Sequence, residues 1–111
     1  MSESLTPTEG ARFLLERERE LAEGASAVYR TAIYTPDTTF TGVATLADDG
    51  TATVAHPISA GAAPTKAPED LVAKLRMLAK LTARSASKKR EDGLPPWPSR
   101  VLRWRGPGRG E

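Results

Sequence analysis

Hydrophobic residues recur with helical spacing in the first part of the chain, between residues 7 and 24. Apolar positions three and four apart are typical of an amphipathic helix, so this stretch predicts a first helix. A capping box that begins at Thr6, followed by Pro7, marks its start, and Gly24 marks its end. The alternating charges of residues 16–20 then form its solvated face. The apolar positions of this predicted helix are Ala11, Phe13, Leu14, Leu15, Leu21, Ala22 and Ala25.

The pattern changes over residues 25–58, where threonine and β-branched residues are interrupted by turn sequences. This composition predicts three antiparallel strands, separated at residues 36–37 and 48–50. The second turn allows two registers: a two-residue turn, or a three-residue loop in which Gly50 is left-handed. We prefer the three-residue loop because it separates apolar from polar residues better.

The preferred register gives the predicted sheet an apolar inner side and a half-wet outer side. It places Ala44 opposite Val54. It also places Phe40 between Ile33 on one neighbouring strand and Ile58 on the other. An apolar sheet face requires a covering layer, so we expect the helices on this side. The predicted inner residues are Ala27, Tyr29, Ile33, Phe40, Ala44, Leu46, Ala52, Val54 and Ile58.

A second helical pattern runs from Pro68 to Arg90, after a connector of small residues at 59–67. Two acidic residues in the first turn and a basic last turn both complement the helix dipole. After Leu81 the apolar positions stop, and Gly93 ends the helix. Its predicted buried stripe is Leu71, Val72, Leu75, Leu78, Ala79 and Thr82.

These elements predict a single α+β domain over residues 1–93, in the order helix, three-stranded antiparallel meander, helix (α-β-β-β-α). Residues 94–111 form a basic tail that contains proline and both tryptophans, and we expect it to be partly docked, or disordered at its end. The prolines impose an extended path, which favours a strap that pins Trp97, although the P-x-x-P-x-R pattern at 95–100 also fits a peptide-binding groove. Val101, Leu102 and Trp104 can then form a short helix or strand against the body.

Composition and charge change this picture in two respects. Aromatic residues make up only 5% of the 111 residues, so the core is thin, and self-association can supply missing burial. Residues 1–55 carry four basic and nine acidic side chains, whereas residues 56–111 carry twelve basic and five acidic ones. The basic half is either a nucleic-acid surface or a surface that the acidic first helix neutralises. We give the second interpretation more weight.

Several classes of chemistry are disfavoured. The chain has no cysteine and one histidine, His56, so we expect no metal site and no cofactor. The paired carboxylates at 48–49 are explained by turn chemistry, and no phosphate-binding loop is present. We therefore expect no enzyme, and keep one centred on His56 as a remote alternative. No signal peptide or apolar span is evident, and arginine outnumbers lysine, which together indicate a bacterial cytoplasmic protein without a membrane contact.

The sequence thus predicts a small non-enzymatic protein-interaction module that self-associates or binds a protein partner, with no evident small-molecule substrate. The alternative is non-specific nucleic-acid binding through basic side chains and stacking tryptophans. The predicted partner-binding residues are Trp97, Arg100, Val101, Leu102, Arg103, Trp104 and Arg105. The predicted nucleic-acid contacts of the alternative are Arg84, Lys88, Lys89 and Arg90.

Overall fold

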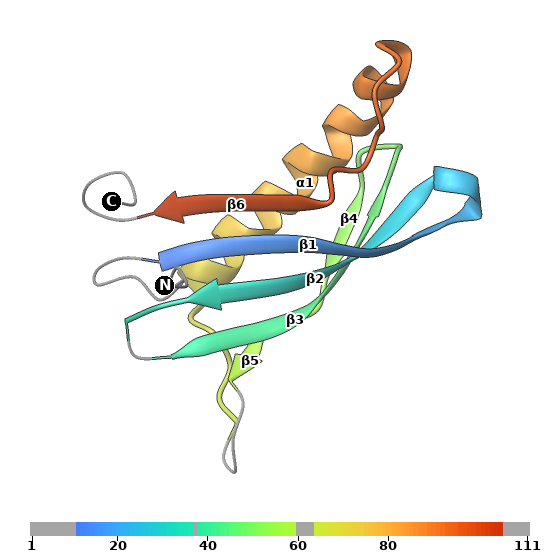
Figure 1. Ribbon diagram of the computed structural model, residues 1–111. Coiled ribbons are helices and arrows are strands. Elements are labelled where there is room, and N and C mark those ends of the chain that lie inside the picture. The colour runs from blue at the N-terminus through green and yellow to red at the C-terminus, as the bar shows by residue number, and fades with distance from the viewer. Residues whose placement is uncertain (1–10, 37, 60–63, 106–111) are drawn as a thin grey trace, which may run out of the picture.

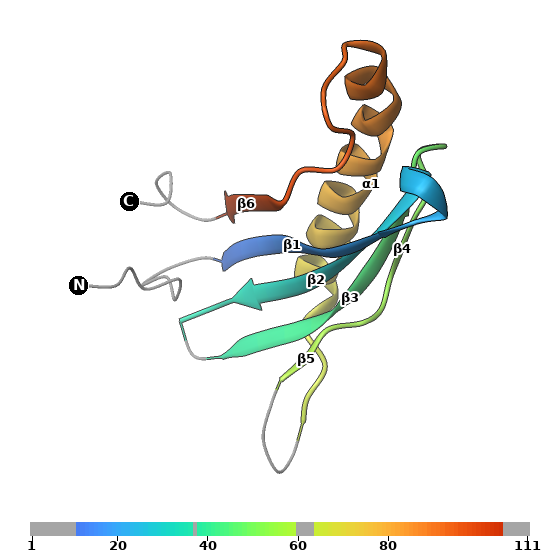
Figure 2. The same ribbon diagram turned by 45° about the vertical axis from the view of Figure 1, so that its right-hand side comes forward.

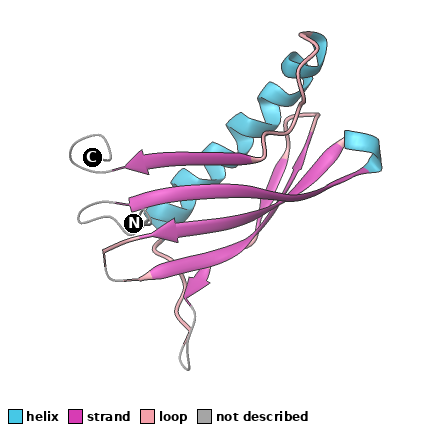
Figure 3. Cartoon of the chain, in the orientation of Figure 1, coloured by secondary structure: helices cyan, strands magenta, loops and turns pink. Residues whose placement is uncertain are grey.

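The computed structural model describes residues 11–36, 38–59 and 64–105, which form an antiparallel sheet with one long helix on one face (Figure 1). Figure 2 shows the helix crossing that face, and Figure 3 shows that strands dominate the chain. The strands lie in the order β4-β3-β2-β1-β6, and β5 also pairs with β3. In chain order the elements are β1 (Ala11–Leu21), the short 3-10 turn η1 (Ala22–Gly24), β2 (Ser26–Tyr34), β3 (Thr39–Ala47), β4 (Ala52–Val54), β5 (Ile58–Ser59), α1 (Glu69–Glu91) and β6 (Arg100–Arg105).

The predicted first helix is wrong, because Ala11–Leu21 is a strand. The fold is α+β, but α1 is the one α-helix among the described residues, and the sheet is larger than the predicted meander. The predicted capping box at the start of that helix lies outside the described residues. β1 lies between β2 and β6, so its backbone is paired on both sides. Pairing on both sides satisfies the backbone groups that a helix would have satisfied internally.

The side chains of β1 alternate with a period of two instead of following a helical stripe. Phe13 and Leu15 are buried on the side that faces α1, and Leu14 is buried on the other side. A bulge between Arg17 and Arg19 interrupts the register with β2. Glu18 forms an ion pair of 3.3 Å across the sheet with Arg30. The alternating charges are therefore part of a sheet and not the solvated face of a helix.

The registers predicted for the first two hairpins of the meander are confirmed. Ile33 pairs with Phe40, and Ala44 pairs with Val54, as the three-residue loop requires. Gly50 has a φ of +93°, a left-handed conformation that glycine adopts without strain. Turn chemistry and hydrophobic register were sufficient to predict this part of the sheet.

The register beyond β4 differs from the prediction by one residue. Phe40 pairs with Ser59, whereas Ile58 pairs with Thr41 and is 45% exposed. The chain between β4 and β5 therefore contains one extra residue relative to β3, in the segment that includes the buried Pro57. Because side chains alternate along a strand, a slip of one residue moves Ile58 from the inner face to the outer face.

The second predicted helix is confirmed as α1, which begins directly after Pro68, while Gly93 follows its end with a φ of +76°. The helix packs on β1, β3 and β4. No helix in the described part of the chain is long and apolar enough to cross a membrane. The buried residues of α1 are Val72, Leu75, Ala79, Thr82, Ala83 and Ala86.

Candidate functional site

Trp97 lies in the core of its own chain and is fully buried. Its indole N–H donates a 2.8 Å hydrogen bond to the Gly24 carbonyl. The Arg17 guanidinium donates to the Trp97 carbonyl at 2.8 Å, and the Tyr29 hydroxyl donates to the Pro98 carbonyl at 2.6 Å. The proline-rich segment is therefore a strap that holds Trp97 against the sheet.

The hydroxyl of Tyr29 is part of this strap contact. Burial raises the pKa of Tyr29 to about 12, and the nearby Arg17 cation counteracts part of that rise. A neutral phenol keeps its proton for the hydrogen bond to Pro98. The strap contact is consequently stable throughout the neutral range of pH.

After the strap, the chain forms β6, so of the two options predicted for this segment, a short helix or a short strand, the structure shows the strand. β6 pairs with β1, and on its other side it pairs with no strand among the described residues. The backbone N–H of Arg17 donates to the Ser99 carbonyl at 2.9 Å. Hydrogen-bonded pairs recur at every second position of an antiparallel ladder. The backbone groups of Val101 and Arg103 therefore point to β1, whereas those of Leu102 point to the open edge.

A small hollow of about 160 Å³ lies beside this open edge, between β6 and α1. Val101 is buried, Leu102 is half-buried, and Arg100 and Arg103 are exposed. The lining of the hollow includes both apolar side chains and the cations Lys89 and Arg103. Its lining comes from Leu78, Leu81, Thr82, Ser85 and Lys89 of α1, from Pro98, and from Val101 and Arg103 of β6.

The predicted partner-binding residues thus divide into two groups. Trp97 is enclosed by its own chain, while Arg100, Leu102 and Arg103 lie along the edge strand. The backbones of Trp104 and Arg105 belong to β6, but their side chains lie outside the described part of the structure. Whether any of these residues contacts a partner remains a prediction.

The predicted nucleic-acid residues do not share one face of α1. Successive helical residues point about 100° apart, so Lys88, Lys89 and Arg90 point in three directions. Arg90 donates to Asp48 at 2.8 Å and to the Gly24 carbonyl at 2.7 Å, and Lys88 lies 3.5 Å from Asp92. Arg84 instead lies on the outer face of the helix, in a group that the sequence analysis did not single out.

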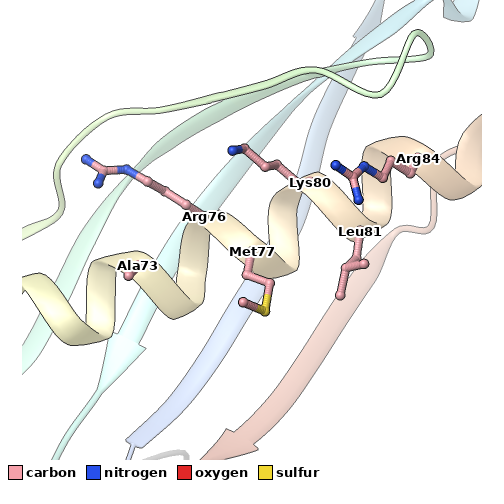
Figure 4. Close-up of a pocket in the computed structure, with 6 residues that line it drawn as sticks. All are labelled: Ala73, Arg76, Met77, Lys80, Leu81 and Arg84. Atoms are coloured by element: carbon pink, nitrogen blue, oxygen red, sulfur yellow. The ribbon is translucent and has the colours of Figure 1, made fainter.

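That group lines a shallow hollow of about 400 Å³ on the solvent side of α1 (Figure 4). In the close-up, the Arg76, Lys80 and Arg84 side chains extend from one side of the helix, and Met77 and Leu81 from the adjacent side. The recurrence of cations at every fourth residue is visible in the sequence, but the sequence does not show that these cations lie beside exposed apolar side chains. We call the residues Ala73, Arg76, Met77, Lys80, Leu81 and Arg84 the α1 outer face.

His56, the centre of the remote enzyme alternative, lies between β4 and β5. Its Nε2 atom is 2.9 Å from the Ala67 carbonyl, and its Nδ1 atom is 3.5 Å from the Glu69 carboxylate. Within residues 11–36, 38–59 and 64–105, no group of three or more histidine and acidic side chains is arranged to hold a metal ion. The observed contacts of His56 connect the sheet to the start of α1.

Comparison with known protein families, with curated protein sequences and with solved structures finds no match for this chain. The edge strand β6 and the helix α1 are therefore the features that indicate a function.

Proposed function

We propose that this protein is a small interaction module that self-associates by pairing the open edge of β6 with β6 of a second copy. The observation that supports this proposal is the position of β6 at the end of the sheet, where one of its sides pairs with no other described strand. An edge strand presents a row of free N–H and C=O groups, which another strand satisfies.

The sequence of β6 is compatible with antiparallel pairing to itself. A two-fold axis through Leu102 places Leu102 opposite its counterpart, and Val101 opposite Arg103. In this register no arginine lies directly opposite an arginine. The two Leu102 residues donate one backbone hydrogen bond to each other in each direction. The hollow beside β6 gives the added strand further apolar contact through Leu78 and Leu81.

Repulsion between arginines opposes the pairing of two β6 strands, so the salt dependence of the dimer tests the proposal. Each β6 carries three arginines, so two copies bring six cations together. Salt screens this repulsion, and we expect the dimer to become tighter as sodium chloride rises from about 0.05 M to about 0.5 M. Binding to a nucleic acid has the opposite salt dependence.

The test is the mass of the full chain in solution, measured by light scattering after gel filtration and by sedimentation equilibrium. Leu102→Pro removes an N–H from the open edge and leaves the pairing with β1 in place. It removes two hydrogen bonds per dimer, worth roughly 1 kcal/mol each, so we expect about thirtyfold weaker association.

The matched control is Leu102→Ala, which removes the side chain and keeps the N–H. Arg100→Pro removes a second N–H on the open edge and serves if Leu102→Pro does not fold, as judged by circular dichroism. A monomer at protein concentrations up to about 1 mM and at all salt concentrations would overturn the proposal. So would a dimer that both proline variants leave unchanged.

A further inference from the structure

The α1 outer face exposes apolar and cationic side chains together. Met77 and Leu81 are each 55% exposed, although they lie one helical turn apart in the middle of the longest element. Large apolar side chains that are exposed as neighbours mark contact surfaces more often than isolated ones do. This face shares Leu81 with the hollow beside β6, but its other residues lie outside that hollow. The inference concerns a different partner and goes beyond the proposed self-association.

The cations of this face are not neutralised by any acidic side chain that the structure describes. Among the described residues, Arg76, Lys80 and Arg84 form no ion pair. The acidic first helix that was expected to neutralise them is a strand, and its Glu18 and Glu20 pair with arginines of the sheet. Between residues 71 and 90 the helix carries seven basic and no acidic side chains.

We infer that the α1 outer face docks an acidic amphipathic helix of another protein. Residues four apart form the ridges along which helices pack, and this face has two such ridges, one apolar and one cationic. Ala73 at the end of the apolar ridge is small enough to allow close approach. A helix with leucines on one side and glutamates beside them complements both ridges.

A nucleic acid is the other anionic partner to consider. Phosphates would meet the cationic ridge, but they would leave Met77 and Leu81 against polar groups. An acidic helix buries both side chains and satisfies the same cations. A second copy of this chain is a poor partner for this face. Its one α-helix among the described residues is α1, which is basic and would repel the cations.

The test uses two synthetic peptides of about 18 residues, a length of five helical turns. One has leucines at helical spacing with glutamates on either side. The other has the same composition, but its leucines are distributed around the helix. Fluorescence anisotropy of the labelled peptides measures binding to the full chain. We expect the amphipathic peptide to bind at least about tenfold tighter, because only this peptide buries a continuous apolar side.

Variants of the two ridges separate the contributions. Met77→Ser with Leu81→Ser should weaken binding about tenfold or more, through lost apolar burial. The triple change of Arg76, Lys80 and Arg84 to Gln should weaken binding and reduce its salt dependence. Val43→Ser and Lys74→Gln, which lie outside the α1 outer face, are the matched controls and should change nothing. Circular dichroism checks that each variant is folded.

A labelled DNA duplex is the competing probe. If the duplex binds more tightly than both peptides, and the serine variant binds it normally, the surface binds phosphates and the inference is wrong. Equal affinity for the two peptides, or no binding of either, would also overturn it. The self-association proposal is tested in a separate experiment, which measures the mass of the protein in solution without peptide.

Discussion

The indole of Trp97 donates its hydrogen bond to the carbonyl of Gly24, a residue 73 positions earlier in the chain. The same carbonyl accepts from Arg90 at the end of α1. Gly24 itself has a φ of +90°, which a residue with a side chain adopts only with strain. One backbone oxygen thus connects the turn after β1, the end of the helix and the strap.

Replacing Trp97 should be among the most destabilising changes in this protein. We expect Trp97→Ala to lower the free energy of unfolding by about 3–5 kcal/mol, because it leaves a large cavity in the core. Trp97→Phe should cost less, since Gly24 keeps its bond from Arg90. Urea unfolding followed by circular dichroism measures both, with Val43→Ala as an exposed control. A small effect of Trp97→Ala would show that the strap is not part of the folded core.

Tyr29 should make stability depend on pH at the alkaline end. Its pKa is about 12 in the folded protein against 10.0 for an unburied phenol, so the unfolded chain loses this proton first. Stability is then complete below pH 10 and decreases between pH 10 and pH 12, by up to about 2–3 kcal/mol.

The control for this prediction is Tyr29→Phe, which removes the titrating group and also the bond to Pro98. The variant should be less stable at neutral pH, and its stability should decrease less steeply above pH 10. Parallel curves for the two proteins, measured by urea unfolding at each pH, would contradict the prediction.

Thr31 offers a stabilising substitution. Its side chain is fully buried, and its hydroxyl has no hydrogen-bond partner among the described residues. Thr31→Val keeps the shape and removes the unsatisfied group, so we expect a gain of about 1 kcal/mol in the free energy of unfolding. Thermal unfolding measures the gain, and Thr45→Val on the exposed outer face is the control. A loss of stability would indicate that the hydroxyl is satisfied in solution.

Gly42 lies close to Thr31, so position 31 is sensitive to the size of its side chain. A side chain at Gly42 would meet the Thr31 hydroxyl at 3.2 Å and the Pro57 backbone at 3.4 Å. The pair Thr31 and Gly42 lies at the centre of the contact between β2 and β3. Valine at 31 must therefore fit the same space that the threonine occupies.

Local rules were sufficient to predict the middle of this fold. The loop at Gly50, the pairing of Ala44 with Val54 and the start of α1 after Pro68 all follow from turn or capping chemistry. These features depend on residues close together in the sequence. The register near Ile58 did not follow, because one inserted residue changes the face of the strand without changing the composition.

The first strand could not be predicted in the same way. Leucine, glutamate and arginine all favour helices, and the contiguous Phe13, Leu14 and Leu15 fit either period. Long-range pairing decides that this segment is a strand, because β2 lies on one side of it and β6 on the other. The alternation of charge over residues 16–20 was a period-two signal, and it was interpreted as solvation.

Of the two candidate surfaces, one was predicted in part from the sequence and the other was not. The edge strand was anticipated as one option for Val101 and Leu102, from the apolar residues that follow the prolines. The α1 outer face was not predicted as a combined apolar and cationic surface, although Arg84 was named as a nucleic-acid contact, and the exposure of Met77 and Leu81 was not anticipated. The direction in which a helix turns its borderline residues depends on which face the sheet covers, and that is a property of the assembled fold.

The position of β6 also determines when the molecule can be completed during its synthesis. β1 is made before the other described elements, whereas β6, one of its two neighbours in the sheet, is made after them. Until then, β1 is an edge and the core lacks its largest side chain, Trp97. A partly made chain that holds every other described element but lacks β6 therefore exposes an unpaired strand edge and an incomplete core, and both are completed only when residues 97–105 have been made.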